Sequence, residues 1–461
     1  MDHTTRLSPS EGLRRLAEYP FQVLTWIDAS GYPMSVAVNA TIDPPTGTAS
    51  VGVPAGLSVP DGTEVSLTGS HIRPMPGYGY DERRHVSVWG GAQLRAGSLV
   101  LAASSAWGWD ESEVPFFEYS ERSIGQSRRY FDTLSAERGT PVRPQLSRGW
   151  LALRATRLPF LTATLVPILI GLTIAARHGF FDPLTALLTL VGGAFIQIGL
   201  NVANDVFDTT QGADELNVTP TRYSGGSRVI QYGLLTLRQM QGLAAAAYAG
   251  GIAVGLVLLA LTGSLVLLLI GVVGVVVSLG YTAPPLKLVY RGLGEVAVAL
   301  GFGPLMLVGA YVVQSRGVVD LEPLVASVPI GLLVAMILYV NEIPDRRSDA
   351  RAGKRTLPVR FGRESVVRGF VVAVGAAYAT TVAGVLVGVL PVTALAVLLT
   401  IPLARRVHDG LRPNYDNPYT LMAVMATNIQ LHALAGALLF VAYVVVLVAG
   451  ALAPSVPFFV R

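Results

Sequence analysis

Long apolar segments alternate with short charged segments over the C-terminal two-thirds of the chain, whereas the N-terminal part carries charges throughout. A membrane-spanning helix needs about 20 mostly apolar residues. The pattern therefore predicts about nine spans, at residues 158–176, 183–204, 240–261, 264–282, 294–314, 323–342, 366–389, 391–404 and 420–450. We expect an all-α, multi-span membrane bundle over residues 150–461, preceded by a small soluble domain over residues 1–149.

The hydrophobic pattern of the N-terminal part has a different period. Residues 21–28 and 32–42 alternate between apolar and polar positions around a turn at Gly31, which predicts a β-hairpin. Four more short runs follow, each bounded by Gly or Pro: TASVGV, EVSLTG, RHVSVWG and SLVLAAS. Many short strands at this spacing predict a small β-barrel. A polar helix over residues 116–137 should lead to the first span.

Charge and composition predict which side of the membrane each end of the chain faces, and they exclude several classes of protein. Only 14% of residues are charged, against about 25% in soluble proteins. Arg and Lys gather in alternate loops, so the positive-inside rule places the N-terminal domain in the cytoplasm and, with nine spans, the C-terminus outside. We expect a multi-pass protein of the cell (cytoplasmic) membrane, with the lipid bilayer as a partner. A net charge of +4 without a basic tract indicates no nucleic-acid partner, and the absence of Cys excludes disulfides.

Two predicted spans end in acidic clusters on the cytoplasmic side. Helical spacing places on one face of the second span the residues Gln197, Asn201, Asp205 and Asp208. The sixth span repeats the pattern on one face with Asn341, Asp345 and Asp349. Such charges can be ordinary solvated helix ends, but acidic residues near a helix C-terminus oppose the macrodipole. The repeated placement therefore favours a functional role.

Oxygen ligands without His or Cys favour Mg²⁺, which keeps coordination positions open for substrate phosphates. The candidate metal ligands are Asp205, Asp208, Asp345 and Asp349, and we expect Asp205 and Asp345 to be catalytic. The amides Gln197, Asn201 and Asn341 are candidates for substrate binding.

Basic residues for a diphosphate lie in the adjacent cytoplasmic loops. Arg228 follows the Gly-rich segment SGGS, where glycines let the backbone approach a ligand. Tyr281 and Lys287, the two ends of the segment YTAPPLK, are two further catalytic candidates. Lys354 and Arg355 are candidates for diphosphate binding. Lys287 and Lys354 are the only lysines of the chain, and both lie in these loops.

These motifs resemble those of the UbiA superfamily of intramembrane prenyltransferases. Four long segments carry the resemblance in the same order: NVANDVFDTTQGAD (201–214), GGSRVIQYG (225–233), YTAPPLKLVYRGLGE (281–295) and NEIPDRRSDARAGKRTLPVRFG (341–362). Within the superfamily, the chain is most similar to the prenyltransferases of 1,4-dihydroxy-2-naphthoate in menaquinone synthesis. Some relatives read Asn-Asn or Asn-Asp where this chain has Asn341-Glu342.

The resemblance implies a helical bundle with a cavity open to lipid, in which Mg²⁺ bridges the acidic motifs and a polyprenyl diphosphate. Diphosphate departs, and the electron-rich ring of an aromatic acceptor attacks the allylic cation. A different aromatic or lipid acceptor stays open at this point. A transporter and a barrel with a membrane anchor are further alternatives. Transporters place ionisable groups near the bilayer midplane, and an anchor needs no acidic motifs, so both fit less well.

The N-terminal part resembles the pyridoxamine-phosphate-oxidase-like split barrel, a flavin-binding fold. The hairpin around Gly31 and the segment PGYGYDERRHVSVWG (76–90) carry this resemblance. It implies that Arg73, Arg83 and Arg84 could bind a flavin phosphate. The alternative is a barrel that has lost its cofactor.

Overall fold

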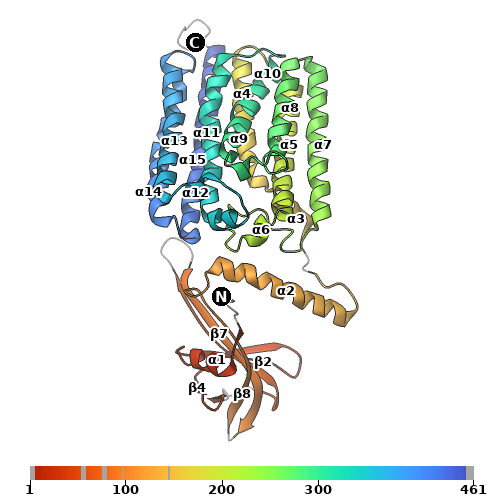
Figure 1. Cartoon of the computed structure of the whole chain (residues 1–461), viewed down its shortest axis with the longest axis vertical. Helices are drawn as coiled ribbons and strands as arrows, with labels where there is room; N and C mark the ends of the chain where they lie inside the picture. Colours follow the sequence, from red (N-terminus) through yellow and green to blue (C-terminus); the bar gives the residue numbers. More distant parts are fainter. Residues whose placement is uncertain (1–5, 53–58, 75–79, 96, 144–145, 453–461) are drawn as a thin grey trace. The chain divides into compact units, whose positions relative to one another are not determined.

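The computed structural model describes residues 6–52, 59–74, 80–95, 97–143 and 146–452. The chain divides into two compact units, Met1–Gly125 and Gln126–Arg461, drawn in Figure 1. This division falls inside helix α2 (Phe116–Arg138). The domain boundary after residue 149 stays a prediction.

The N-terminal unit is built on a curled, antiparallel sheet of eight strands in the order β3-β2-β6-β7-β8-β5-β4, with β1 paired to β8. The strands are β1 (Arg6–Leu7), β2 (Gln22–Ile27), β3 (Pro33–Val38), β4 (Ala40–Asp43), β5 (Thr48–Gly52), β6 (Glu64–Pro74), β7 (Tyr80–Arg95) and β8 (Ser98–Asp110). The expected hairpin is confirmed, because β2 and β3 pair from Gln22↔Val38 to Ile27↔Pro33. Among the described residues no pairing joins β3 to β4, so the split barrel stays a prediction.

Helix α1 (Pro9–Leu16) covers this sheet and completes its core. Ser8 caps the helix by accepting a hydrogen bond from the Glu11 backbone. A β-carbon on Gly12 would lie 2.2 Å from the Ala106 β-carbon, so only glycine lets α1 approach β8 this closely. Leu13 and Leu16 are fully buried as a result.

Two of the three arginines proposed for a flavin phosphate pair with carboxylates of the same unit. Arg73 lies 2.7 Å from Asp81, and Arg83 lies 2.6 Å from Glu111. Residues 76–79 of the segment that suggested a flavin lie outside the described residues. A flavin in this unit therefore stays an untested prediction.

The second unit is helical, and its long helices stand side by side (Figure 1). The elements are α3 (Arg148–Thr156), η1 (Leu158–Leu161), α4 (Thr162–Arg177), α5 (Pro183–Thr210), α6 (Ala213–Leu216), α7 (Leu237–Thr262), α8 (Leu265–Gly280), η2 (Val289–Arg291), α9 (Gly294–Leu300), η3 (Gly301–Val308), α10 (Gly309–Gln314), α11 (Leu321–Arg351), α12 (Leu357–Arg360), α13 (Arg363–Leu386), η4 (Val392–Thr400), α14 (Ile401–Asn414) and α15 (Pro418–Leu452). The short elements α3, α6 and α12 lie at one end of the bundle.

Six stretches of helix in the described part of the chain are long and apolar enough to cross a membrane: α5, α7, the continuous run α9–η3–α10, α11, α13 and α15. Helices α4 and α8 are apolar but have 16 residues each. The segment expected as a span at 391–404 instead forms the 3₁₀-helix η4, which continues into α14. The count of nine spans therefore stays a prediction.

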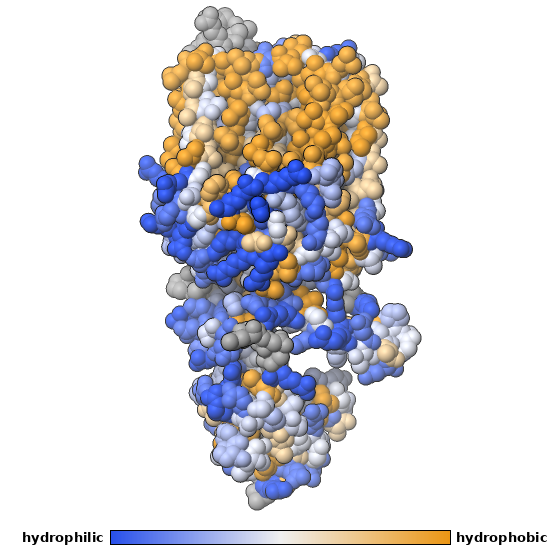
Figure 2. Space-filling model, viewed as in Figure 1, coloured by the Kyte–Doolittle hydropathy of each residue, from blue (hydrophilic) through white to orange (hydrophobic). Residues whose placement is uncertain are grey.

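Apolar side chains cover the helical unit on the face shown in Figure 2, and hydrophilic side chains gather at one end of it. Inside, glycines bring helix backbones together. A β-carbon on Gly303 of η3 would lie 2.8 Å from the Ser327 carbonyl oxygen, and one on Gly331 of α11 would lie 2.4 Å from the Ala299 carbonyl oxygen. Small residues at such contacts are typical of membrane helix packing.

Candidate active site

The C-terminal half of α5 presents the first acidic motif, and its side chains are buried as the helical spacing predicts. Gln197, Asn201, Asp205 and Asp208 are all at most 9% exposed. The Gln197 amide donates to Asn201 Oδ1 at 3.1 Å, and Asn201 Nδ2 donates to the Thr156 carbonyl at 3.1 Å. These hydrogen bonds join the two amides to each other and to the C-terminal end of α3.

The loop at residues 217–236, between α6 and α7, packs closely against these carboxylates. The Ser227 backbone N–H donates to Asp205 Oδ2 at 3.1 Å. Gly226 has φ +74°, and a β-carbon there would lie 3.0 Å from Asp205 Oδ1 and 3.5 Å from Asp214 Oδ1. Both the backbone angle and the space therefore require glycine. Arg228 is 6% exposed and donates to the Asp214 carbonyl at 2.5 Å.

The same loop reaches the second acidic motif, on α11. Asp345 Oδ1 accepts hydrogen bonds from Asn217 Nδ2 and from Ser224 Oγ, both at 3.0 Å. Asn341 Nδ2 donates to the Tyr223 carbonyl at 3.2 Å. The 217–236 loop therefore joins the two motifs, which are more than a hundred residues apart in the sequence.

Lys354 bridges the motifs directly. Its ammonium nitrogen lies 3.2 Å from Asp208 Oδ2 and 4.0 Å from Asp349 Oδ1. Burial alone would lower the pKa of Lys354, but the Asp208 and Asp349 carboxylates raise it above its usual value. Burial, followed by the Asp208 and Asp205 carboxylates, raises the pKa of Asp214 well above its usual value. Carboxylates of both motifs are thus crowded around the buried Lys354.

Tyr290 is one of the groups at the site that the sequence did not single out. Its hydroxyl donates to Asp208 Oδ1 at 2.9 Å. The two lysines contact its ring, with Lys354 Nζ 5.5 Å and Lys287 Nζ 5.3 Å from the ring centre. Tyr290 lies within the YTAPPLKLVYRGLGE segment, three residues after Lys287, so its place in that motif was the available signal.

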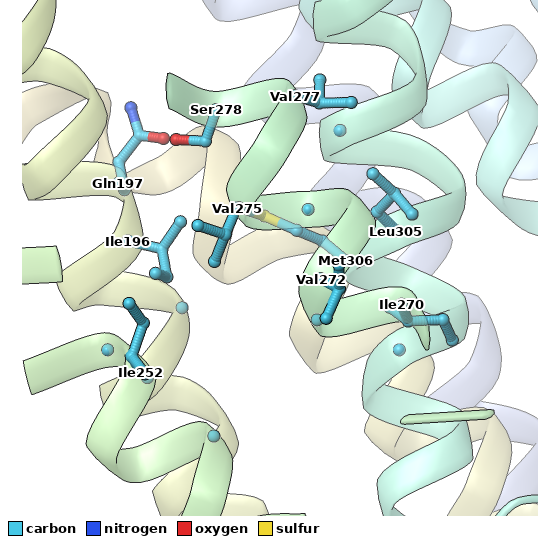
Figure 3. Close-up of a pocket in the computed structure, with 18 of the residues that line it drawn as sticks. Ile196, Gln197, Ile252, Ile270, Val272, Val275, Val277, Ser278, Leu305 and Met306 are labelled. Atoms are coloured by element: carbon cyan, nitrogen blue, oxygen red, sulfur yellow. The ribbon is translucent and has the colours of Figure 1, made fainter. Parts of the chain in front are cut away.

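Two cavities meet at this site. The first has a volume of about 180 Å³ and is lined by members of both acidic motifs, together with Lys354, Asp214, Gly225 and Gly226. The second has a volume of about 460 Å³ and is mostly apolar, between α5, α7, α8 and η3. Figure 3 shows Ile196, Ile252, Val275 and Met306 around it. Both cavities are lined by Gln197, Leu200, Tyr281, Val298 and Phe302.

Most of the residues expected at the site are brought together, and two are not. The polar cavity is lined by the expected residues Gln197, Asn201, Asp208, Tyr281, Asn341, Asp345, Asp349 and Lys354. Asp205 and Arg228 are buried beside the cavity without lining it: Asp205 accepts from Ser227 of the 217–236 loop, and Arg228 of that loop donates to the Asp214 carbonyl. Lys287 and Arg355 do not line either cavity as described. The exposed Arg355 holds the Arg360 side chain through its backbone carbonyl.

A family model described as the UbiA prenyltransferase family matches residues 164–429. The chain belongs to this family. It is 28% identical over 293 residues to the 1,4-dihydroxy-2-naphthoate octaprenyltransferase of Bacillus subtilis (strain 168), covering 64% of this chain and 92% of that one. It is 31% identical over 240 residues to the enzyme of the same name from Escherichia coli (strain K12), covering 49% and 72%. A solved UbiA homolog from Archaeoglobus fulgidus, bound to DMAPP and Mg²⁺, is 16% identical and covers 62% of this chain and 98% of that one, with a TM-score of 0.46.

The ligand atoms that the site of this prenyltransferase offers fit a Mg²⁺ ion. The acidic groups offer oxygen ligands, and Asp205 Oδ1 is buried without a hydrogen-bond partner among the described residues. In the described part of the chain no three His, Cys, Asp or Glu side chains converge closely enough to enclose a metal by themselves. This arrangement suits Mg²⁺, which takes one or two carboxylates and completes its shell with water and substrate phosphates.

Proposed function

We propose that this prenyltransferase transfers a polyprenyl group from polyprenyl diphosphate to 1,4-dihydroxy-2-naphthoate in menaquinone biosynthesis. The observation that carries the proposal is the junction of two cavities, one lined by carboxylates and Lys354 and the other by apolar side chains. A diphosphate suits the first cavity and an isoprenoid tail suits the second. The relatives from Bacillus subtilis and Escherichia coli are named for this acceptor, which supports the choice.

Mg²⁺ would be held by one or two carboxylates of each acidic motif, Asp205 and Asp208 on α5 and Asp345 and Asp349 on α11. When bound, it would supply positive charge for the oxygens of the departing diphosphate. Lys354 donates hydrogen bonds to the same oxygens from its place between Asp208 and Asp349. The bond from the allylic carbon to the diphosphate oxygen breaks, and a bond from that carbon to the ring forms. The apolar cavity keeps water away from the allylic cation, and the naphthoate then loses its carboxylate as CO₂.

The test is transfer by the purified full-length protein in liposomes. Labelled polyprenyl diphosphate is offered with Mg²⁺ and with one acceptor at a time: 1,4-dihydroxy-2-naphthoate, a hydroxybenzoate, or a lipid precursor with a free hydroxyl. We expect labelled product with the naphthoate and loss of that product in the presence of a chelator. Product with another acceptor alone would replace the proposed acceptor, and product that survives the chelator would remove Mg²⁺.

We further infer that the enzyme lies in the cytoplasmic membrane with its N-terminal unit and acidic motifs in the cytoplasm and its C-terminus outside. The Arg and Lys residues of alternate loops support this orientation. The N-terminal unit is proposed to be a split-barrel-like domain, which its antiparallel strand order supports. Visible absorbance of the purified protein tests for a flavin there.

A further inference from the structure

Two buried glutamates beside the polar cavity take no part in the chemistry described so far. Glu342 on α11 and Glu295 on α9 are each 6% exposed. Neither carboxylate oxygen of Glu342 has a hydrogen-bond partner among the described residues, and Oε1 of Glu295 also has none. The two carboxyl groups lie near each other, where α9 packs against α11.

A buried carboxylate without donors is costly, because burial removes its water and nothing replaces it. A proton shared with Glu295 can satisfy one oxygen of Glu342, and the other oxygen still needs a hydrogen-bond donor that the described residues do not supply. Its position makes a bound ligand the natural source, because Glu342 lines the polar cavity. It lies three residues before Asp345, about 4.5 Å along the helix axis.

The surroundings of Glu342 suit a flat aromatic molecule with hydroxyl groups. Val298 and Phe302, which line both cavities, mark the place where the diphosphate end of the donor meets its tail. Val334, Ile337 and Leu338 add apolar side chains to the wall of the polar cavity. A ring can pack against these side chains while a hydroxyl points to the carboxylate.

We propose that Glu342, with Glu295 beside it, forms the acceptor subsite and accepts a hydrogen bond from a ring hydroxyl of the aromatic acceptor. The inference rests on the proposed function and names the residue that recognises its acceptor. A carboxylate at the hydroxyl also raises the electron density of the ring, which makes the ring a better nucleophile toward the allylic carbon. A structural pair that only shares a proton between α9 and α11 would not distinguish acceptors by their hydroxyls.

The test compares wild type with Glu342→Gln and Glu342→Leu, using Glu364→Gln as the matched control. Glu364 is on α13. Its half-exposed side chain forms an ion pair with Arg412 and does not line either described cavity. We expect KM for 1,4-dihydroxy-2-naphthoate to rise at least tenfold in both Glu342 variants, while KM for polyprenyl diphosphate stays within twofold. The control should match wild type in both constants.

Inhibition constants of acceptor analogues that lack one hydroxyl test the role of Glu342 in acceptor binding without relying on turnover of the analogue. Wild type should bind 1,4-dihydroxy-2-naphthoate more tightly than either 1-hydroxy- or 4-hydroxy-2-naphthoate. Glu342→Leu should abolish this preference against the analogue that lacks the recognised hydroxyl. The inference would be overturned if Glu342→Leu still bound 1,4-dihydroxy-2-naphthoate more tightly than both analogues, to the same degree as wild type. It would also be overturned if the variant needed more Mg²⁺ but bound the acceptor normally. Failure of wild type with every naphthoate would instead overturn the proposed function.

Discussion

At the scale of single residues, Asp205 and Asp345 receive their hydrogen bonds from the same loop. Ser227 donates to Asp205, and Ser224 donates to Asp345. We expect Asp205→Asn and Asp345→Asn each to lower turnover about 100-fold or more, because ligands that hold Mg²⁺ contribute several kcal/mol to the transition state. The amide keeps the size and an acceptor oxygen, so both variants should still fold, as size-exclusion chromatography in detergent can show. Near-normal turnover of either variant at limiting Mg²⁺ would disprove its metal role.

The sequence predicts the same role for Lys287 and Lys354, whereas the structure places the two lysines in different surroundings. Both lie in motif loops, but only Lys354 is buried between carboxylates, and Lys287 lies against the Tyr290 ring without lining a cavity. We expect Lys354→Arg to lose about tenfold in kcat/KM, equivalent to about 1.4 kcal/mol, because the planar guanidinium is wider than the ammonium. Lys287→Arg should behave as wild type. Equal losses in both variants would restore Lys287 to the diphosphate site.

Helical periodicity was sufficient to predict the residues that α5 and α11 bring to the site, because a regular helix fixes which residues share a face. It could not predict the contacts of loop residues. Tyr290, Asn217 and Ser224 reach Asp208 and Asp345 through turns whose direction depends on tertiary packing. The unpartnered state of Glu342 was invisible for the same reason, since burial is a property of the packed bundle.

At the scale of elements, α8 lines the apolar cavity with glycines. A β-carbon on Gly274 or Gly271 would meet no atom within 4 Å, so a larger side chain there can enter the cavity without displacing protein. These positions lie about 10 and 15 Å along the helix from Tyr281, which lines both cavities. We expect Gly274→Leu to exclude long polyprenyl diphosphates and Gly271→Leu to exclude only the longest. The measurement is kcat/KM over a series of donor chain lengths.

The control for this series is Gly242→Leu on α7, which is exposed, has open space at its β-carbon and does not line the described cavities. It should accept every donor that wild type accepts. Equal chain-length profiles for all three variants would show that the tail lies elsewhere. Single-residue hydropathy could not predict this lining, because glycine contributes nothing distinctive to an apolar segment.

Hydropathy predicted where most of the long helices lie, but it did not predict whether a segment is an α-helix, a 3₁₀-helix or a π-helix. Helices α5, α7, α11, α13 and α15 lie where the apolar segments predict them. The segment at 294–314 contains the π-helix η3 with Pro304 inside it, and the segment at 391–404 begins as a 3₁₀-helix. An apolar segment reports burial in lipid, whereas the hydrogen-bond pattern of its backbone depends on the residues packed around it.

At the scale of the whole molecule, the membrane orientation can be tested in this Cys-free chain. Exposed positions are available in a predicted cytoplasmic loop (Asp409), directly after the end of α13 on the predicted outer side (Val387) and in the N-terminal unit (Thr46). We expect single cysteines at 409 and 46 to react with an impermeant maleimide only after the cytoplasmic side is opened. The cysteine at 387 should react in intact cells. Labelling of 387 and 409 from one side would contradict the orientation.

Prenyl transfer should not need the N-terminal unit. Every residue that lines the two described cavities lies at or beyond Arg157, so the site itself belongs to the helical unit. The second half of α2 also belongs to that unit, because Arg128 donates to the Ile230 carbonyl at 2.8 Å, within the 217–236 loop that holds the carboxylates.

We therefore expect a chain that begins at Gln126 to transfer prenyl groups in liposomes at a rate within a few-fold of the full chain. A chain that begins at Arg148 should keep activity but unfold at a lower temperature, since it lacks the contact of Arg128 with the loop. Comparison of the two truncations separates the sheet from α2. Loss of transfer in a folded chain that begins at Gln126 would show that the N-terminal unit takes part in catalysis.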